Sequence, residues 1–279
     1  MGNSSYDRWQ LSAGPDLGLS FQGKGCDLTF WTRGHSVTPT PGASVSTVPD
    51  FSNPVDISTG NIYLKTGYHQ EGRLSFSRGR RGAGSSYLNI RLDGSVDLNE
   101  VTRASWYDLS AVRYSIPVNS KRPSYNANLN MTYIQALNRK KSLNLTITPK
   151  ANYRTGTFYI SNGALSGFDK DEFDYSEVMK RLYGDENGNE FYCGKSGFKE
   201  NRTQDFDWST DAGLKYELKW WSLRAGASIV NSRTWYSATP YVKVNTWKRT
   251  ATFKYRSFCV HPIFDDSAMI AFILCLETI

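Results

Sequence analysis

Hydrophobic and polar residues alternate along most of the chain with a period of two. Between Leu143 and Tyr153 the odd positions are apolar or aromatic, whereas the even positions are Asn, Thr or Lys. Such a segment has one apolar and one polar face as a β-strand, and it has no apolar stripe as a helix. The same alternation recurs at 9–21, 88–98, 214–220, 223–229 and 251–255. The pattern predicts an all-β chain.

The gaps between these segments predict hairpin turns. Side chains on one face of an antiparallel pair lie opposite each other, so turn length and apolar parity must agree. Turns at Gly23-Lys24, Asn138–Ser142, Trp220-Trp221 and Lys248-Arg249 satisfy this condition. Gly23 is expected to supply the positive φ of a primed turn. The second turn sets Tyr133 opposite Ile147, and the third sets Leu218 opposite Leu223.

Short and long connections alternate along the chain. Short turns are expected near 22–25, 69–72, 99–103, 138–142, 220–221 and 248–249, with looser links near 79–86, 119–126 and 232–235 and long surface loops at 34–60 and 155–206. An up-and-down sheet places alternate connections at opposite ends, so one end is tight and the other elaborated. Outer-membrane barrels have this asymmetry, whereas a Greek-key sandwich does not.

We therefore expect an all-β, antiparallel, up-and-down transmembrane β-barrel of about twelve strands over residues 1–258. Whether these strands close on themselves or form part of a larger barrel is left open. The tail at 259–279 differs, because it lacks Lys and Arg and contains the apolar run 268–276. It is interpreted either as an extra strand or as foreign sequence.

The composition alone favours a water-soluble protein. The chain has 279 residues, 39% of them hydrophobic, and a mean hydropathy of −0.50. No apolar run reaches the roughly 18 residues of a transmembrane helix. Barrel strands are half polar and barrel loops are wet, so a transmembrane barrel gives the same average.

Two sets of side chains are candidates for functional surfaces. Aromatic residues at predicted strand ends are expected at the membrane interface: Trp106, Trp208, Trp220, Trp221, Trp235, Tyr236 and Trp247. Charged residues at polar strand positions are expected to line the lumen: Lys215, Glu217, Lys219, Arg224, Lys254 and Arg256. The cations among them would favour anions, with Glu217 opposing that preference.

Other chemistry has little support in the sequence. No GxSxG motif, CxxC motif or complete calcium loop is present, and no catalytic residue, cofactor or metal site is predicted. His35, His69 and His261 have no mutual spacing suited to a metal and are expected in turns or loops. The net charge of +7 lacks the clustering of a nucleic-acid surface. Spacing leaves the disulfide state of Cys26, Cys193, Cys259 and Cys275 open.

Three segments carry a family resemblance: SLNLTITPKANYRTGTFYISNG, DAGLKYELKWWSLRAGASIV and YVKVNTWKRTATFKYRS. They resemble outer-membrane β-barrel proteins of Bacteroidota, of uncharacterised function, and more distantly the barrel of TonB-dependent receptors. The resemblance covers roughly residues 6–258 and implies a bacterial outer-membrane location. The chain lacks a recognisable plug domain and TonB box, and no site residue is carried over.

The expected function is passage of a solute or binding of a surface ligand, without covalent chemistry. The expected partners are outer-membrane lipid and that solute or ligand, and the oligomeric state is left open. The alternative is a secreted or surface-exposed soluble β-sandwich, in which the aromatic residues would form the core and a ligand platform. A hydrolytic barrel enzyme is the third interpretation.

Overall fold

The computed structural model describes residues 13–45, 49–50, 52–79, 86–107, 110–161, 174–184, 191, 197–217, 221–237 and 243–257. Within these ranges the chain forms β1 (Asp16–Gly23), β2 (Cys26–Val37), α1 (Pro41–Val45), β3 (Asp56–Ser58), β4 (Gly67–Arg78), β5 (Ser86–Leu98), β6 (Val101–Tyr107), β7 (Arg113–Asn119), β8 (Ser124–Ala136), β9 (Leu143–Ile160), α2 (Tyr175–Tyr183), β10 (Lys199–Glu217), β11 (Trp221–Tyr236) and β12 (Lys243–Ser257). None of the helices among the described residues is long and apolar enough to cross a membrane.

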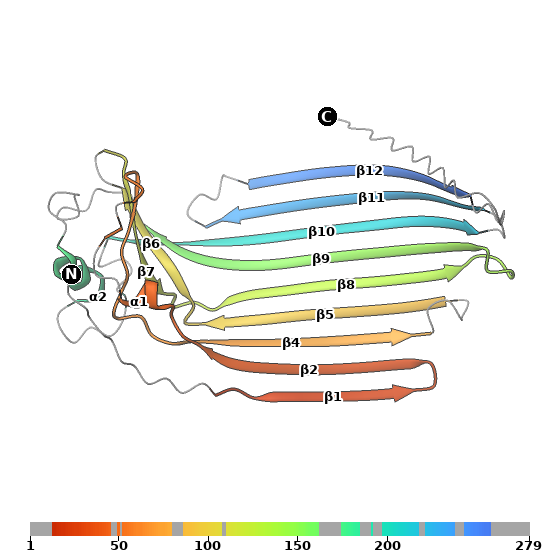
Figure 1. Cartoon of the computed structure of the whole chain (residues 1–279), viewed down its shortest axis with the longest axis horizontal. Helices are drawn as coiled ribbons and strands as arrows, with labels where there is room; N and C mark the ends of the chain where they lie inside the picture. The colour runs from red at the N-terminus through yellow and green to blue at the C-terminus, as the bar shows by residue number, and fades with distance from the viewer. Residues whose placement is uncertain are drawn as a thin grey trace, which may run out of the picture.

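Nine long strands form one antiparallel sheet in the order β1-β2-β4-β5-β8-β9-β10-β11-β12 (Figure 1). This order follows the chain, apart from β3, β6 and β7, which lie off the path. The predictions of an all-β, antiparallel, up-and-down arrangement and of about twelve strands are confirmed. The predicted tail at 259–279 lies outside the described residues.

The described strands do not close into a barrel. The strands β1 and β12 are the two ends of the path and do not pair with each other. Every pairing along the path is antiparallel. Nine strands joined in this way leave β1 and β12 pointing in the same direction, which Figure 1 also shows. Antiparallel pairing between these two edges is therefore excluded, so of the two possibilities that the sequence left open, closure of the described strands on themselves does not occur.

The three longest connections, 38–66, 99–123 and 161–198, lie at one end of the sheet, in line with the predicted asymmetry, although 237–242 at that end is no longer than 79–85 at the other. The turns 24–25, 79–85, 137–142 and 218–220 join strands at one end, which we call the short-turn end. The connections 38–66, 99–123, 161–198 and 237–242 lie at the opposite end, which we call the long-loop end. Several predicted positions were wrong. The predicted turns 69–72 and 232–235 lie inside β4 and β11, and the predicted loops at 34–60 and 155–206 begin within β2 and β9. The predicted short turn at 99–103 lies at the long-loop end, and the predicted looser link at 79–86 lies at the short-turn end.

The registers of the hairpins test the predicted turns. Tyr133 pairs with Ile147, so the register predicted for the Asn138–Ser142 turn is confirmed. Tyr216, rather than Leu218, pairs with Leu223. The β1–β2 turn is likewise displaced by one position, and Gly25 has the positive φ of 80° that was expected at Gly23. Moving a turn by one position moves the pairing by two residues, so every side chain keeps its predicted face.

The turn predicted at Lys248-Arg249 is absent. Both residues lie inside β12, where Lys248 pairs with Val230 and Arg249 pairs with Ile229. The partner strand β11 continues to Tyr236, so the chain reverses at 237–242 instead. The two adjacent charges fit a strand because one side chain lies on each face of the sheet.

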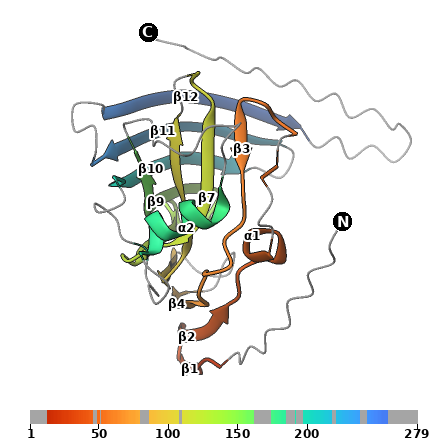
Figure 2. The same cartoon turned by 90° about the vertical axis from the view of Figure 1, so that its left-hand side faces the viewer.

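The buried core lies at the long-loop end and not beneath the sheet. There β7 pairs with β6 and, in parallel, with β3, and β6 joins β9 through the parallel pair Ala104↔Tyr159. The helix α2 lies beside these strands (Figure 2). We call this unit the cap. Its core contains Ile57, Ala104, Trp106, Tyr114, Ile116, Val118, Tyr159, Val178, Met179, Leu182, Tyr183, Phe191 and Phe198.

Candidate functional site

One face of the long sheet is apolar across its nine strands, and we call it the apolar face. One cross-strand row consists of Leu19, Phe30, Leu74, Leu92, Leu129, Ala151 and Trp208. The neighbouring row contains Phe21, Leu28, Phe76, Ile90 and Met131. Asn231 and Arg249 interrupt these two rows on β11 and β12.

The apolar face is exposed. Phe21 and Leu19 at one edge are 63% and 60% exposed, and Leu92 in the middle of the sheet is still 43% exposed. The twelve described strands belong to one sheet, so no second sheet covers this face within the described residues. This differs from a soluble sandwich, in which the apolar faces of two sheets pack on each other.

The opposite face of the sheet is polar, and we call it the polar face. On its β1–β5 side the charges are paired. Arg73 and Arg91 both donate to Asp93, at 2.5 and 2.7 Å, and the Arg73 guanidinium lies 5.1 Å from the centre of the Trp31 ring. Cations on this side are therefore held by carboxylates and an aromatic ring.

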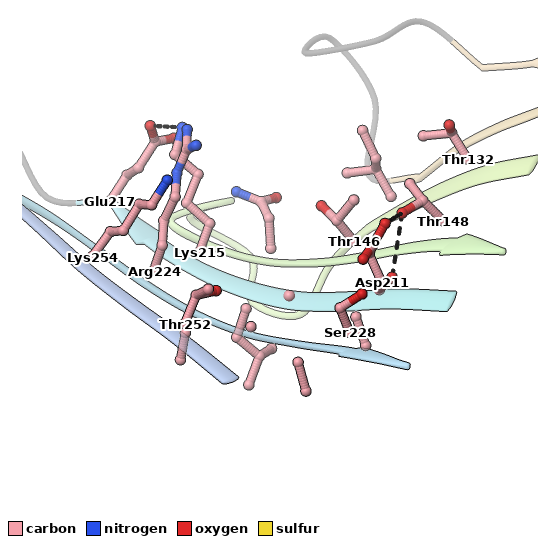
Figure 3. A pocket seen from close by; sticks show the side chains of 18 of the residues that line it. Thr132, Thr146, Thr148, Asp211, Lys215, Glu217, Arg224, Ser228, Thr252 and Lys254 are labelled. Atoms are coloured by element: carbon pink, nitrogen blue, oxygen red, sulfur yellow. Dashed lines mark hydrogen bonds and ion pairs between the residues drawn. The ribbon is translucent and has the colours of Figure 1, made fainter. Parts of the chain in front are cut away.

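A cavity of about 880 Å³ lies on the polar face over β8–β12, near the short-turn end. Figure 3 shows side chains of these strands pointing into it from the surrounding sheet. Among its lining residues are four of the six side chains predicted to line a lumen: Lys215, Glu217, Arg224 and Lys254. The cavity is thus the site at which the predicted charges come together.

Three cations form one cross-strand row in this cavity, and we call it the cation row. Lys215 pairs in register with Arg224, and Arg224 pairs with Lys254. Glu217 forms an ion pair with Lys215. Within the described residues neither Arg224 nor Lys254 is paired with a carboxylate. Like charges at directly opposed positions destabilise a sheet. An anion bound between these side chains would offset their repulsion, so the row is suited to anion binding.

The other end of the cavity has a different character. Asp211 lies four residues before Lys215 on β10, and Thr148 donates a long hydrogen bond of 3.4 Å to its carboxylate (Figure 3). Ser228 pairs with Asp211 on one side, and Thr250 continues the row. This end, which we call the hydroxyl row, offers one carboxylate among several hydroxyl groups.

Two glycines separate the cation row from the hydroxyl row. Gly213 and Gly226 are directly paired between β10 and β11. Both glycines line the cavity. Along their strands they alternate with the residues of the apolar face, so a side chain at either position would project from the polar face into the cavity. The cavity therefore has a floor of bare backbone between its two polar ends.

The remaining predicted lumen residues are less fully placed. Lys219 lies outside the described residues. Arg256 lies in β12 and pairs with Ser222 of β11, but the side chain of Arg256 is not described.

The predicted interface aromatics are divided among several environments. Trp106 is wrong as an interface residue, because it is 1% exposed in the core of the cap. Trp208 and Trp247 lie inside β10 and β12 rather than at strand ends, and their rings are in edge contact at 5.8 Å. The residues placed at a strand end are Trp235 and Tyr236 in β11, and Trp221, whose side chain is not described, begins that strand. Trp220 lies outside the described residues.

The structure also brings together a group that spacing could not reveal. His35 pairs with His69, and His69 pairs with Asp97, on three neighbouring strands. The rings are 5.1 Å apart, and the His69 Nδ1 is 2.5 Å from the Asp97 carboxylate. The prediction that these two histidines lie in turns or loops was wrong. Among the described residues no three His, Cys, Asp or Glu side chains, this row included, are placed so that they could hold a metal ion.

The cysteines add one described thiol, since Cys26 in β2 is free and the other three lie outside the described ranges. Comparison with protein-family models, with curated proteins and with solved structures finds no match to the chain.

Proposed function

We propose that the chain forms the wall of a bacterial outer-membrane β-barrel, whose polar face binds or passes a solute without covalent chemistry. The observation that carries this proposal is the exposed apolar face, which continues across nine strands while the opposite face is polar and charged. Transmembrane barrels have this arrangement, with lipid outside and a polar interior.

The burial pattern supports lipid rather than water against the apolar face. Contiguous apolar patches larger than a few hundred Å² are rare on soluble monomers and mark protein or membrane contacts. The cap shows that this sequence can build a buried core, because Trp106, Tyr114 and Ile116 are 0–1% exposed. The long sheet is built differently, with its large apolar side chains left on the outside.

The dimensions of the apolar face support the same proposal. On β10 and its partners the face runs from the row of Phe206 and Tyr153 to the row of Tyr216 and Leu143. Ten residues of strand span about 33 Å. At the tilt of about 40° that membrane strands adopt, this length covers about 25 Å of bilayer, which is the height of the apolar band of outer-membrane barrels.

Closure of such a barrel needs more than the described strands. Because β1 and β12 point in the same direction, antiparallel closure requires an odd number of further strands between them. The proposal is therefore that the described sheet is part of a barrel wall, with the cap at one mouth and the cavity near the other.

The experiment that tests the proposal is heat-modifiable migration. The chain is expressed with a signal sequence, extracted in detergent and compared by gel electrophoresis with and without boiling. We expect the unboiled protein to migrate as a compact species and to shift after boiling, and we expect it to float with lipid vesicles. A monodisperse monomer that stays soluble without detergent would refute the proposal.

A further inference from the structure

We infer that the cavity on the polar face binds an organic anion that carries hydroxyl groups, of the class of sugar acids and sugar phosphates. This inference rests on the proposed solute function and names its substrate class. It depends on three features of one cavity: the cation row, the hydroxyl row and the glycine floor between them.

The cation row selects the charge of the ligand. Lys215, Arg224 and Lys254 lie on three adjacent strands in one register, and Glu217 neutralises part of their charge. Carboxylates and phosphates accept short, charge-assisted hydrogen bonds from such groups, and Arg224 can donate two in parallel. A ligand anion here would also relieve the repulsion among the cations.

The hydroxyl row selects groups that donate and accept hydrogen bonds. Asp211 needs donors, and its hydrogen bond from Thr148 is long, at 3.4 Å. Ser228 and Thr250 can each donate and accept. Ligand hydroxyl groups satisfy both needs, whereas a second anionic group would be repelled by Asp211.

The glycine floor sets the length and shape of the ligand. Asp211 and Lys215 are four residues apart on one strand, which separates the two rows by about 13 Å. The paired glycines leave the backbone between them bare, so a ring can lie flat against it. A volume of about 880 Å³ accommodates a ligand of disaccharide size. An inorganic anion would reach one row, and a neutral sugar would leave the cation row unsatisfied.

Calorimetric titration of the full chain, folded in detergent, tests the inference with three probes. Lactobionate is a disaccharide acid, lactose is its neutral counterpart, and sulfate supplies charge alone. We expect lactobionate to bind at least tenfold more tightly than either of the others, because it alone engages both rows. Equal binding of sulfate and lactobionate, or of lactose and lactobionate, would overturn the inference.

Two variants with matched controls locate the site. Arg224→Gln should weaken lactobionate at least tenfold, and Lys150→Gln, on the same face outside the cavity, should leave it unchanged. Gly213→Val should fill the floor and also weaken lactobionate at least tenfold. A Cβ at Gly213 would approach the Ala225 carbonyl oxygen at 3.7 Å, an ordinary contact, so the sheet should fold.

Gly94→Val is the control for Gly213→Val, because a Cβ at Gly94 meets the Asn126 carbonyl oxygen at a similar 3.8 Å but lies on the apolar face. Full lactobionate affinity in both Arg224→Gln and Gly213→Val would place the ligand elsewhere and overturn the inference. Heat-modifiable migration of the same samples keeps the two proposals apart. A heat-modifiable protein that ignores lactobionate contradicts this inference alone, and a detergent-free soluble protein that binds it contradicts the membrane proposal alone.

Discussion

A charge placed on the apolar face distinguishes lipid from water as the medium around it. Leu92 is the residue to change, because it lies in β5 near the middle of the sheet, between Leu74 and Leu129. Leu92→Arg introduces a cation in the same row. Ser95→Arg is the matched control, since Ser95 lies three residues away on the polar face and pairs with Glu71.

The two media give different costs for Leu92→Arg. Near the bilayer midplane, Arg on the lipid face of a barrel costs about 2–4 kcal/mol. In water the cost is bounded by the burial of Leu92, whose side chain is 43% exposed. Full burial of Leu stabilises by about 1.5–3 kcal/mol, so partial burial limits the loss to about 0.9–1.7 kcal/mol, and the Arg stem recovers part of it.

Urea titration of the protein in lipid vesicles, followed by tryptophan fluorescence, measures the free energy of unfolding. We expect Leu92→Arg to lower it by 2 kcal/mol or more and Ser95→Arg to change it by less than about 0.5 kcal/mol. Equal, small effects of the two variants would refute the placement of this face in lipid. Large, equal losses would refute the assignment of the two faces.

The remaining predictions concern the cavity and the cap. In reconstituted bilayers the double variant Lys215→Glu, Arg224→Glu should lose anion preference in conductance, and unchanged selectivity would remove these side chains from the path. Without ligand, Arg224→Gln should raise the free energy of unfolding by about 0.2–1 kcal/mol because it breaks a row of like charges, and a clear loss in urea titration would contradict the reasoning. Burial raises the pKa of Tyr183 to about 12, so its contribution to cap stability is complete below the unfolded value of about 10 and is lost as the pH rises toward 12. Ultraviolet titration of tyrosinate should show this late group, and Tyr183→Phe should abolish it. Arg113 lowers the pKa of Asp56 by hydrogen bonding, so this contribution is complete above about pH 3.9 and is lost as the pH falls through the lower folded value. Asp56→Asn should make acid-induced proteolysis of the cap less dependent on pH. The change should be small, because the ion pair between Asp56 and Arg113 is partly exposed.

The face of each long strand could be predicted from the sequence, although several turns could not. The face on which a side chain lies depends on whether its position in the strand is odd or even. Moving a turn by one position shifts the pairing by two residues, so the face of each side chain does not change. The pairing Tyr216↔Leu223 therefore puts the same residues on the apolar face as the predicted pairing Leu218↔Leu223. Charged residues inside a strand, such as Lys248 and Arg249, resemble a turn because turn residues are also polar.

The cap could not be predicted from alternation. In β7, Tyr114, Ile116 and Val118 alternate as the membrane-type strands do, yet all three are 0–1% exposed. A period of two states that one face is apolar and does not state what covers it, so lipid and a protein core give the same pattern. Trp106 is predicted at the membrane interface because it lies beside a predicted strand end, and a position along a strand likewise does not state what covers a side chain. The histidine row was also hidden, because His35, His69 and Asp97 meet only through the register of three strands.

The cavity combines two features that each weaken a sheet. Glycine inside a strand costs roughly 0.5–1 kcal/mol relative to Ala, and Gly213 lies directly opposite Gly226. Opposed like charges add a further cost, and the cation row lies two residues from this glycine pair. Packing gives no reason for a glycine at position 213, where a Cβ would make only an ordinary contact of 3.7 Å, whereas a Cβ at Gly226 would meet the Ala212 carbonyl and the Thr252 hydroxyl oxygen at 3.3 Å. Departures from local rules that gather in one place are expected at functional sites. The bare floor and the charged row therefore have one common explanation, which is a ligand that occupies the space and neutralises the charge.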